Sequence, residues 1–174
     1  MLLNEHGRPA GTALKATVHG ADTPLHRAFS CYLFSRTGQL LLTRRAASKR
    51  TFPGLWTNTV CGHPAPGESD LAAIRRRSRQ ELQLPVDRVE PALPDFRYQA
   101  SSGGIMENEI CPVYLARSEG QPQPDPTETH ATKWVDWAQF LHRLAAAPER
   151  FTPWSLLQAG QLQPAVDRYL TKRP

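Results

Sequence analysis

Hydrophobic residues in the first third of the chain are grouped in short runs that are typical of strands. Residues 28–34 and 39–43 are rich in aromatic and aliphatic side chains, and the polar stretch 35–38 between them has the composition of a turn. Residues 57–61 predict a third strand. This part of the chain is therefore expected to be mainly extended.

The middle of the chain changes to a helical period. A helix is expected from about residue 68 to about residue 84, with Pro85 ending it. One face of this helix carries apolar or small side chains, at Leu71, Ile74, Ser78 and Leu82. The four arginines of the segment fall largely on the other faces: Arg75, Arg76, Arg77 and Arg79.

The second half mixes extended runs with helices. The extended runs are expected at 95–99, 109–116 and 132–135. Residues 137–146 have a helical pattern, and Thr152 followed by a proline predicts that another helix begins at Trp154. Gly160 and Pro164 are expected to break or kink that helix. Strands and helices do not alternate strictly, so the pattern predicts a layered α/β or α+β domain and not a doubly wound sheet.

Length and composition indicate one soluble domain spanning residues 1–174. Hydrophobic residues make up 40% of the chain, and no uncharged apolar run approaches the roughly 20 residues that cross a membrane. No secretory signal is visible, and three cysteines are too few for a disulfide scaffold, so a cytoplasmic location is expected. The net charge of +5 suits an anionic ligand, but it is also common on proteins without one.

Three histidines and two carboxylates are candidate ligands of one divalent metal: His19, His26, His63, Glu107 and Glu109. The two glutamates are two positions apart, so on a strand their side chains leave the same face. Two carboxylates aimed at one point repel each other unless a cation or a proton lies between them. Imidazole with carboxylate suits Mn, Zn or Fe. The alternative is a set of unrelated surface groups, because the histidines are far apart in sequence.

Residues 62–84 resemble the Nudix box, the motif with which Nudix enzymes hold Mg²⁺ and a diphosphate. The positions that match the box are Gly62, Glu68, Arg76, Glu81 and Leu84. Arg77 and Gln80 stand where the box has carboxylates, and Gln83 stands where it has glycine. A Nudix hydrolase needs those carboxylates to hold its metals and activate water. A basic amphipathic surface helix is therefore an equally good interpretation of the pattern alone.

Cys61 differs from the other two cysteines. Cys31 and Cys111 lie inside apolar runs and are interpreted as structural, whereas Cys61 lies next to Gly62 and the candidate ligand His63. A nearby cation would favour its thiolate. A buried, inert thiol is the alternative, and the residues alone do not decide between the two.

Basic and aromatic residues supply further candidates. Arg45 and Lys49, with Lys15 upstream, form either a solvated charge run or a clamp for a diphosphate. Tyr98 and Trp154 have the composition of core residues. Beside a metal, the phenol of the first could donate a proton, and the indole of the second could face a cation.

Taken together, the chain resembles the type I isopentenyl-diphosphate isomerase family. The segments that carry the resemblance run in order from about Asn4 to Trp154: LHRAFSCYLF, LLLTRRAASK, FPGLWTNTVCGHP, GES…RR…EL, PDFRY, ENEICPVY and FTPW. TNTVCGHP together with ENEICPV is the most specific pair, because Nudix hydrolases do not carry it. The family's version of the Nudix box lacks the same carboxylates.

The resemblance implies a Nudix-like α/β/α sandwich with a mixed β-sheet, and a 1,3-allylic proton shift on a small-molecule diphosphate. The implied ligands of one Mn²⁺, Zn²⁺ or Mg²⁺ ion are His19, His26, His63, Glu107 and Glu109. A second ion, Mg²⁺ on the substrate diphosphate, would be held by Glu81 and by the carbonyl of Cys61. The implied diphosphate contacts are Lys15, Arg45, Lys49 and Arg76.

In the implied reaction, Cys61 lies on one face of the five-carbon chain and removes a proton. Glu109 and Tyr98 lie on the other face, and Trp154 closes over the hydrocarbon. The residues leave open whether Glu109, Tyr98 or a metal-bound water delivers the proton. No organic cofactor, nucleic acid or membrane is implied, and a monomer or weak homodimer is expected.

Two other functions compete with this one. A Nudix pyrophosphohydrolase acting on a diphosphate would share the fold, but Arg77 and Gln80 count against it and Cys61 has no role in it. A non-enzymatic binder of phosphate or nucleic acid is suggested only by the positive charge, and it leaves the histidines unexplained. Without the resemblance, the residues indicate a metal-dependent enzyme acting on a phosphorylated ligand.

Overall fold

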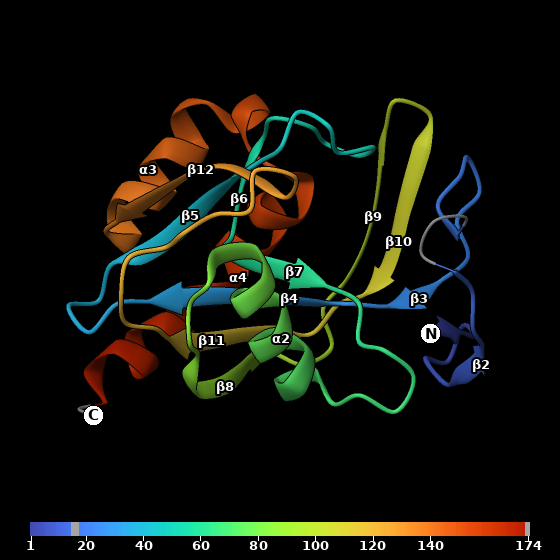
Figure 1. Cartoon of the computed structure of the whole chain (residues 1–174), viewed down its shortest axis with the longest axis horizontal. Helices are drawn as coiled ribbons and strands as arrows, with labels where there is room; N and C mark the ends of the chain where they lie inside the picture. Colours follow the sequence, from blue (N-terminus) through green and yellow to red (C-terminus); the bar gives the residue numbers. More distant parts are fainter. Residues whose placement is uncertain (15–17, 173–174) are drawn as a thin grey trace.

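A computed structural model describes residues 1–14 and 18–172, which form two β-sheets and three α-helices (Figure 1). The larger sheet has the strand order β12-β5-β4-β11-β8, with β6 paired to β5 and β7 paired to β4. Its strands are β4 (Phe29–Phe34), β5 (Leu40–Arg45), β6 (Trp56–Thr57), β7 (Val60–Gly62), β8 (Asp87–Leu93), β11 (Val113–Arg117) and β12 (Thr129–Val135). The sheet is mixed, because β4 and β11 run parallel whereas the other pairs are antiparallel.

The smaller sheet lies at one end of the larger one and has the order β2-β1-β3-β10-β9 (Figure 1). Its strands are β1 (Leu2–Leu3), β2 (Pro9–Gly11), β3 (His26–Arg27), β9 (Arg97–Ser102) and β10 (Ile105–Ile110). The helices are α2 (Asp70–Leu82), α3 (Trp137–Ala146) and α4 (Pro153–Thr171), with the short 3-10 helix η1 (Pro148–Arg150) before the last.

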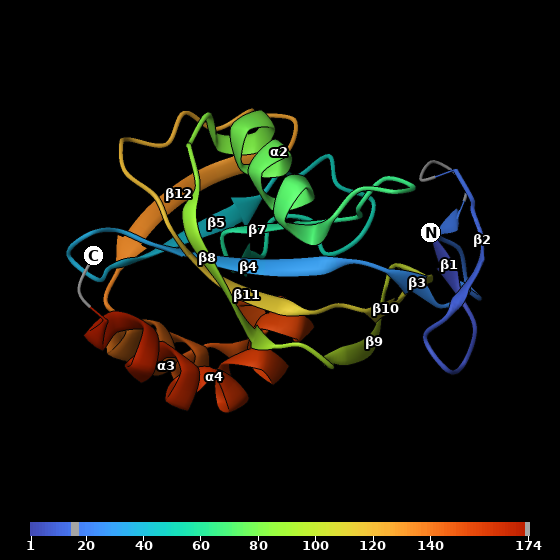
Figure 2. The ribbon, with the colours of Figure 1, turned by 90° about the horizontal axis from the view of Figure 1, so that it is seen from below.

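The helices cover both faces of the larger sheet. Figure 2 shows α2 on one face and α3 with α4 on the other. Strand β4 is buried throughout, and its side chains alternate between two cores: Cys31 and Leu33 pack towards Ile74 of α2, whereas Tyr32 and Phe34 join the core formed with α3 and α4. Burial on both faces explains why this strand is a continuous apolar run. The expected three-layer α/β fold with a mixed sheet is confirmed.

Most expected elements are present, with two strands interrupted. The strands at 28–34 and 39–43 and the helix at 137–146 are confirmed. Residues 57–61 belong to two short strands, β6 and β7. The run 109–116 is divided by Pro112, which has no backbone N–H, so β10 and β11 enter different sheets. Residues 120–126 form the expected loop between β11 and β12.

The face predicted for α2 is partly wrong. Leu71 is 40% exposed, whereas Ala73 and Glu81 are buried beside Ile74 and Leu82. The hydroxyl of Ser69 caps the start of the helix, and Gln83 ends it with a left-handed backbone (φ 54°).

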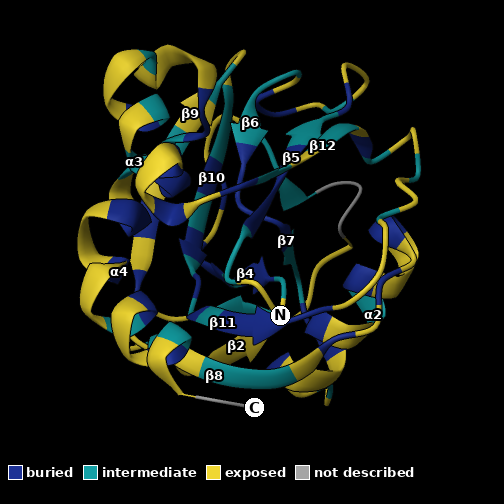
Figure 3. Cartoon of the chain, turned by 90° about the vertical axis from the view of Figure 1, so that its left-hand side faces the viewer, coloured by how far each residue is buried: buried dark blue, intermediate teal, exposed yellow. Residues whose placement is uncertain are grey.

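The predicted break in the last helix is also wrong. Helix α4 begins at Pro153 and continues through Gly160 and Pro164 to Thr171. Both residues are exposed, as the yellow outer surface of α4 in Figure 3 illustrates. The carbonyl that Pro164 leaves without a partner is that of Gly160, four residues earlier, and water can reach it. Within the described residues, no helix is long and apolar enough to cross a membrane.

Candidate active site

A cavity of about 680 Å³ brings together most of the residues singled out in the sequence. Its walls come from strands of both sheets, from α2, from the start of α4 and from the loop that follows β5. The candidate residues that line it are His19, Arg45, Lys49, Cys61, His63, Glu81, Tyr98, Glu107, Glu109 and Trp154. Lys15 lies outside the described residues.

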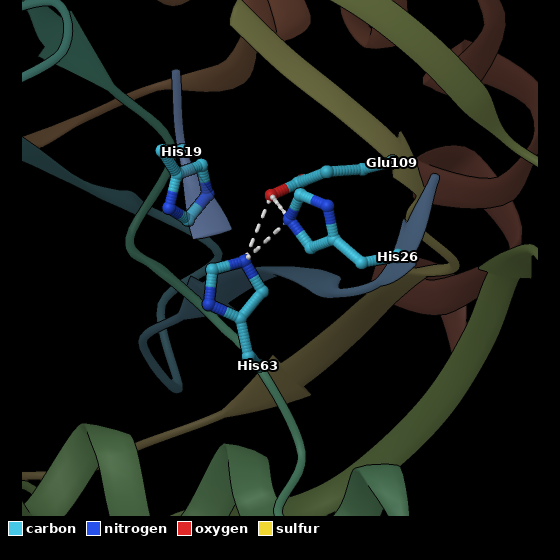
Figure 4. A group of neighbouring side chains, drawn as sticks. All are labelled: His19, His26, His63 and Glu109. Atoms are coloured by element: carbon cyan, nitrogen blue, oxygen red, sulfur yellow. Dashed lines mark hydrogen bonds and ion pairs between the residues drawn. The ribbon is translucent and has the colours of Figure 1, made fainter. Parts of the chain in front are cut away.

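Four side chains converge on one another, and three of them line this cavity (Figure 4). One ligand atom from each of His19, His26, His63 and Glu109 lies within 4.8 Å of those of the other three. The Nε2 atoms of His26 and His63 are 3.2 Å apart, and Glu109 Oε1 lies 3.4 Å from the first and 2.9 Å from the second. The parallel pairing of β3 with β10 places His26 directly beside Glu109.

The donor set of this group suits a divalent cation. The Nδ1 atom of His26 lies 2.9 Å from the carbonyl oxygen of Pro24, so in the neutral ring Nδ1–H donates and Nε2 presents its lone pair. That lone pair faces another imidazole nitrogen. In addition, His19 Nε2 is buried and has no hydrogen-bond partner among the described residues. Three imidazoles and a carboxylate can satisfy all these atoms by ligating one metal.

Glu107 lies beside this group and not within it. Its Oε2 is 3.2 Å from His19 Nε2, and its Oε1 accepts a hydrogen bond of 2.7 Å from the hydroxyl of Thr51. Glu107 and Glu109 are both buried and share one face of β10, as the two-residue spacing predicted. The expected five-residue set is thus present as four converging residues with Glu107 adjacent.

Glu109 connects this four-residue group to the phenol of Tyr98, which donates a 2.9 Å hydrogen bond to Oε2. Burial opposes ionisation of this carboxyl, but the neighbouring imidazoles of His26 and His63 outweigh burial and hold the pKa of Glu109 well below its usual range. Glu109 is therefore an ionised carboxylate that accepts from imidazole on one oxygen and from phenol on the other.

Cys61 lines the cavity at the end of β7. Its thiol donates to Asn58 Oδ1 at 3.2 Å and lies 3.4 Å from the hydroxyl oxygen of Ser30. Burial raises the pKa of Cys61 to about 11, although the Ser30 and Asn58 hydrogen bonds oppose that rise. Cys31 and Cys111 are fully buried in the core, in keeping with the structural role expected for them.

Trp154 and Tyr98 form an aromatic wall of the same cavity. Their ring centroids are 5.7 Å apart, and both side chains are buried. The indole N–H of Trp154 donates to Thr57 Oγ1 at 2.9 Å and to Asn58 Oδ1 at 3.0 Å, which fixes the plane of the ring. These residues therefore belong to the core and to the site at once.

The basic side of the cavity is built from β5, the loop after it, and α2. Arg45 donates to the backbone carbonyls of Thr51 and Phe52, so its guanidinium also holds the loop in place. Its Cζ lies 5.4 Å from the ring centroid of Trp154. Lys49 forms an ion pair with Glu128, a residue of the loop before β12.

The two central arginines of α2 have different environments. Arg76 is not among the residues that line the cavity, and its guanidinium donates to both carboxylate oxygens of Glu68 at 2.8 Å. Arg77 lines the cavity and pairs with Glu81 and Glu128, while its buried Nε has no partner among the described residues. The structure thus brings Arg77, and not the expected Arg76, to the site.

Sequence reasoning missed Arg77, Glu128 and Thr51. For Arg77 a signal was present, because it lies one helical turn before Glu81 and so shares its face. Thr51 and Glu128 had no comparable signal, since each reaches the site from a loop.

Known proteins resemble this chain in sequence and in fold. The family model described as "NUDIX domain" matches residues 24–155. A Frankia alni protein named "Isopentenyl-diphosphate Delta-isomerase" is 53% identical over 91% of this chain and 82% of its own length. An Agromyces mediolanus protein of the same name is 52% identical over 99% of this chain and 84% of its own. A crystal structure of a Deinococcus radiodurans protein, 24% identical, has a TM-score of 0.72 over 93% of this chain and 97% of that one, which supports the fold.

Proposed function

This chain belongs to the Nudix family and, within it, to the isopentenyl-diphosphate Delta-isomerases, and we propose that it converts isopentenyl diphosphate to dimethylallyl diphosphate. The observation that carries the proposal is the set of side chains that line one cavity. It is lined by a thiol, by a carboxylate that accepts a hydrogen bond from a phenol, by an indole, and by arginine and lysine side chains. This combination suits a small molecule with a diphosphate at one end and an alkene at the other.

The reaction moves one double bond by adding a proton and removing another. When the terminal methylene gains a proton, the π electrons form the new C–H bond and leave a tertiary cation. Loss of a proton from the neighbouring carbon then returns an electron pair, which forms the new double bond. Cys61 and the Glu109–Tyr98 pair are the two proton-transfer groups that we assign to these steps, since both line the cavity beside its aromatic wall.

Trp154 is assigned to stabilise the cation between the two steps. Its ring is buried, and its hydrogen bonds to Thr57 and Asn58 hold it in one orientation. A desolvated cation over an indole face gains about 2 kcal/mol or more. The buried position also keeps water from trapping the cation as an alcohol.

Two sets of residues are assigned to hold the ions. His19, His26, His63 and Glu109, with Glu107 as the fifth ligand, would hold one Mn²⁺, Zn²⁺ or Mg²⁺ ion. When bound, this ion neutralises the charge of the carboxylates and fixes the position of Glu109. Glu81, with the carbonyl of Cys61, would hold Mg²⁺ on the diphosphate.

The diphosphate itself is assigned to the basic side of the cavity. In the structure, Lys49 and Arg77 both form ion pairs with Glu128. Arg77 also forms an ion pair with Glu81. With Mg²⁺ and diphosphate bound, the carboxylates would hold the cation, and the ammonium and guanidinium groups would donate to the phosphate oxygens instead. Arg45 adds a third positive charge beside them.

The test is product analysis by NMR after incubation with isopentenyl diphosphate in D₂O. Deuterium should appear in the newly formed methyl group of dimethylallyl diphosphate, and chelation of divalent metal should abolish turnover. Cys61→Ala and Glu109→Gln should each lower kcat by the ~10²–10⁴-fold typical of a lost acid or base. Cys111→Ala is the matched control, since this cysteine also lies 3.4 Å from Ser30 Oγ but does not line the cavity.

Release of inorganic phosphate or a monophosphate as the main product, without exchange at carbon, would refute the proposal and support a Nudix hydrolase. Full activity in Cys61→Ala would refute the assignment of the thiol while leaving the reaction in place.

A further inference from the structure

Thr51 touches two parts of the site from the loop between β5 and β6. Its hydroxyl donates a 2.7 Å hydrogen bond to Oε1 of Glu107, a residue 56 positions later in the chain. Its backbone carbonyl accepts from Arg45 Nη2 at 2.9 Å. The side chain is buried and lines the cavity. Thr51 therefore connects the loop after β5 with strand β10 at the edge of the four-residue group of histidines and Glu109.

The hydrogen bond from Thr51 fixes which oxygen of Glu107 faces the histidines. With Oε1 held by the hydroxyl, Oε2 lies 3.2 Å from His19 Nε2, the buried nitrogen without a hydrogen-bond partner among the described residues. The two oxygens of this buried carboxylate thus have separate roles. One is anchored to the loop, and the other is directed at the edge of the four-residue group.

We propose that Thr51 is a positioning residue that holds Glu107 as the fifth ligand of the metal. The inference rests on the metal site of the proposed function, but not on the reaction carried out there. Groups that hydrogen-bond a metal ligand set its orientation, and their removal typically costs 10–100-fold in metal affinity or activity. Here the same residue also ties the ligand to the loop that Arg45 anchors.

The experiment compares Thr51→Val with Thr51→Ser. Valine keeps the shape and the backbone carbonyl but has no hydroxyl, whereas serine keeps the hydroxyl. The affinity for Mn²⁺ and for Zn²⁺ is measured by competition with a chromophoric chelator. Thr51→Val should bind roughly 10–100-fold more weakly, and Thr51→Ser should stay close to the wild type. Excess metal should restore kcat in Thr51→Val with KM unchanged.

Two controls isolate the interaction. Thr43→Val removes another buried hydroxyl that lines the cavity, but this one donates to the backbone carbonyls of Asn58 and Thr59, so metal affinity should not change. In a Glu107→Ala background the Thr51 hydroxyl has lost its acceptor, and adding Thr51→Val should have little further effect. If Thr51→Val does not fold by circular dichroism, Thr51→Ala replaces it.

Equal affinity in Thr51→Val and the wild type would overturn the proposal. The proposal would also be overturned if Thr51→Val and Thr51→Ser weakened metal affinity equally. The same holds if Thr51→Val lowered metal affinity as much in the Glu107→Ala background as in the wild type. Because metal affinity is the readout, a protein that binds metal as expected but does not isomerise the substrate would refute the proposed function and leave this inference intact.

Discussion

Arg76 and Arg77 are neighbours on α2, and the structure predicts that replacing each of them changes a different property of the protein. Arg76 makes a bidentate ion pair with Glu68, eight residues earlier and before the helix begins, so it holds the loop against the helix. Arg77 faces the cavity. Arg76→Ala should therefore destabilise the fold without changing KM, and Arg77→Ala should raise KM.

The pKa of Glu68 sets the size of the first effect. The hydrogen bond from Arg76 is the main reason that the pKa of Glu68 falls from 4.5 to about 2. At about 1.4 kcal/mol per pKa unit the full shift would be worth about 3 kcal/mol. However, the side chain of Arg76 is 36% exposed, and solvent screening reduces such a pair to about 1 kcal/mol.

The pH dependence of this contribution follows from its sign. Since the pKa of Glu68 is lower in the folded protein than in the unfolded chain, the stabilisation is complete above about pH 4.5 and is lost as the pH falls towards 2. Urea unfolding should show Arg76→Ala about 1 kcal/mol less stable than wild type at pH 7, with the difference shrinking at low pH. Glu68→Gln should lose a similar amount, and the double variant little more.

The second effect is measured by kinetics. Loss of charge-assisted hydrogen bonds costs about 1.5–3 kcal/mol, so Arg77→Ala should raise KM by about 10–100-fold. If Arg76→Ala raises KM as much as Arg77→Ala, or leaves stability at pH 7 unchanged, the division of roles between the two arginines is wrong.

Further predictions concern the support of the site. A Cβ at Gly62 would lie 3.1 Å from Cγ of Arg77, so Gly62→Ala should raise KM and cost about 1–3 kcal/mol of stability in urea unfolding. Gly160→Ala, with nothing within 4 Å of the added Cβ, should instead stabilise the helix by about 0.5–1 kcal/mol, and a loss there would contradict the packing described. Asn58→Ala removes the acceptor of the Cys61 thiol and should lower kcat much more than it changes KM; unchanged kcat would show that this hydrogen bond is dispensable.

The sequence predicts the elements whose side chains follow a simple period, and it fails where polar groups are buried. Strand β4 and helix α3 match their expected ranges closely because their apolar residues alone determine burial. Helix α2 buries Asp70, whose carboxylate accepts from Arg27 and Tyr114, while Leu71 beside it remains partly exposed. Hydropathy does not reveal that an aspartate has partners on β3 and β11, so the predicted face of the helix was displaced.

The site follows the same distinction. Residues with distinctive chemistry, such as His63 and Glu109, are candidates by type alone, but their separation in sequence leaves unrelated surface groups as an alternative, and it is the family resemblance that implies one site. Thr51 and Glu128 are ordinary loop residues by type, and only the folded chain brings them to Glu107 and Lys49. The helical period places Arg77 on the polar side of the helix together with the other arginines. Its side chain is nevertheless only 15% exposed.

We propose that the position of the four-residue group relative to α2 lets one fold serve two kinds of chemistry. In a Nudix hydrolase the helix of the box supplies the carboxylates that hold the metals. Here α2 presents Arg77 to the cavity beside Glu81, and a guanidinium at that point opposes the binding of several cations. The four converging ligands come instead from β3, β10, the residue after β7 and the loop before β3. An ion held by these residues would lie at Glu109, whose other oxygen accepts a hydrogen bond from Tyr98 at the aromatic wall. A cation in that position would act on the proton-transfer group that we propose and not on water at phosphorus, which would favour chemistry at carbon.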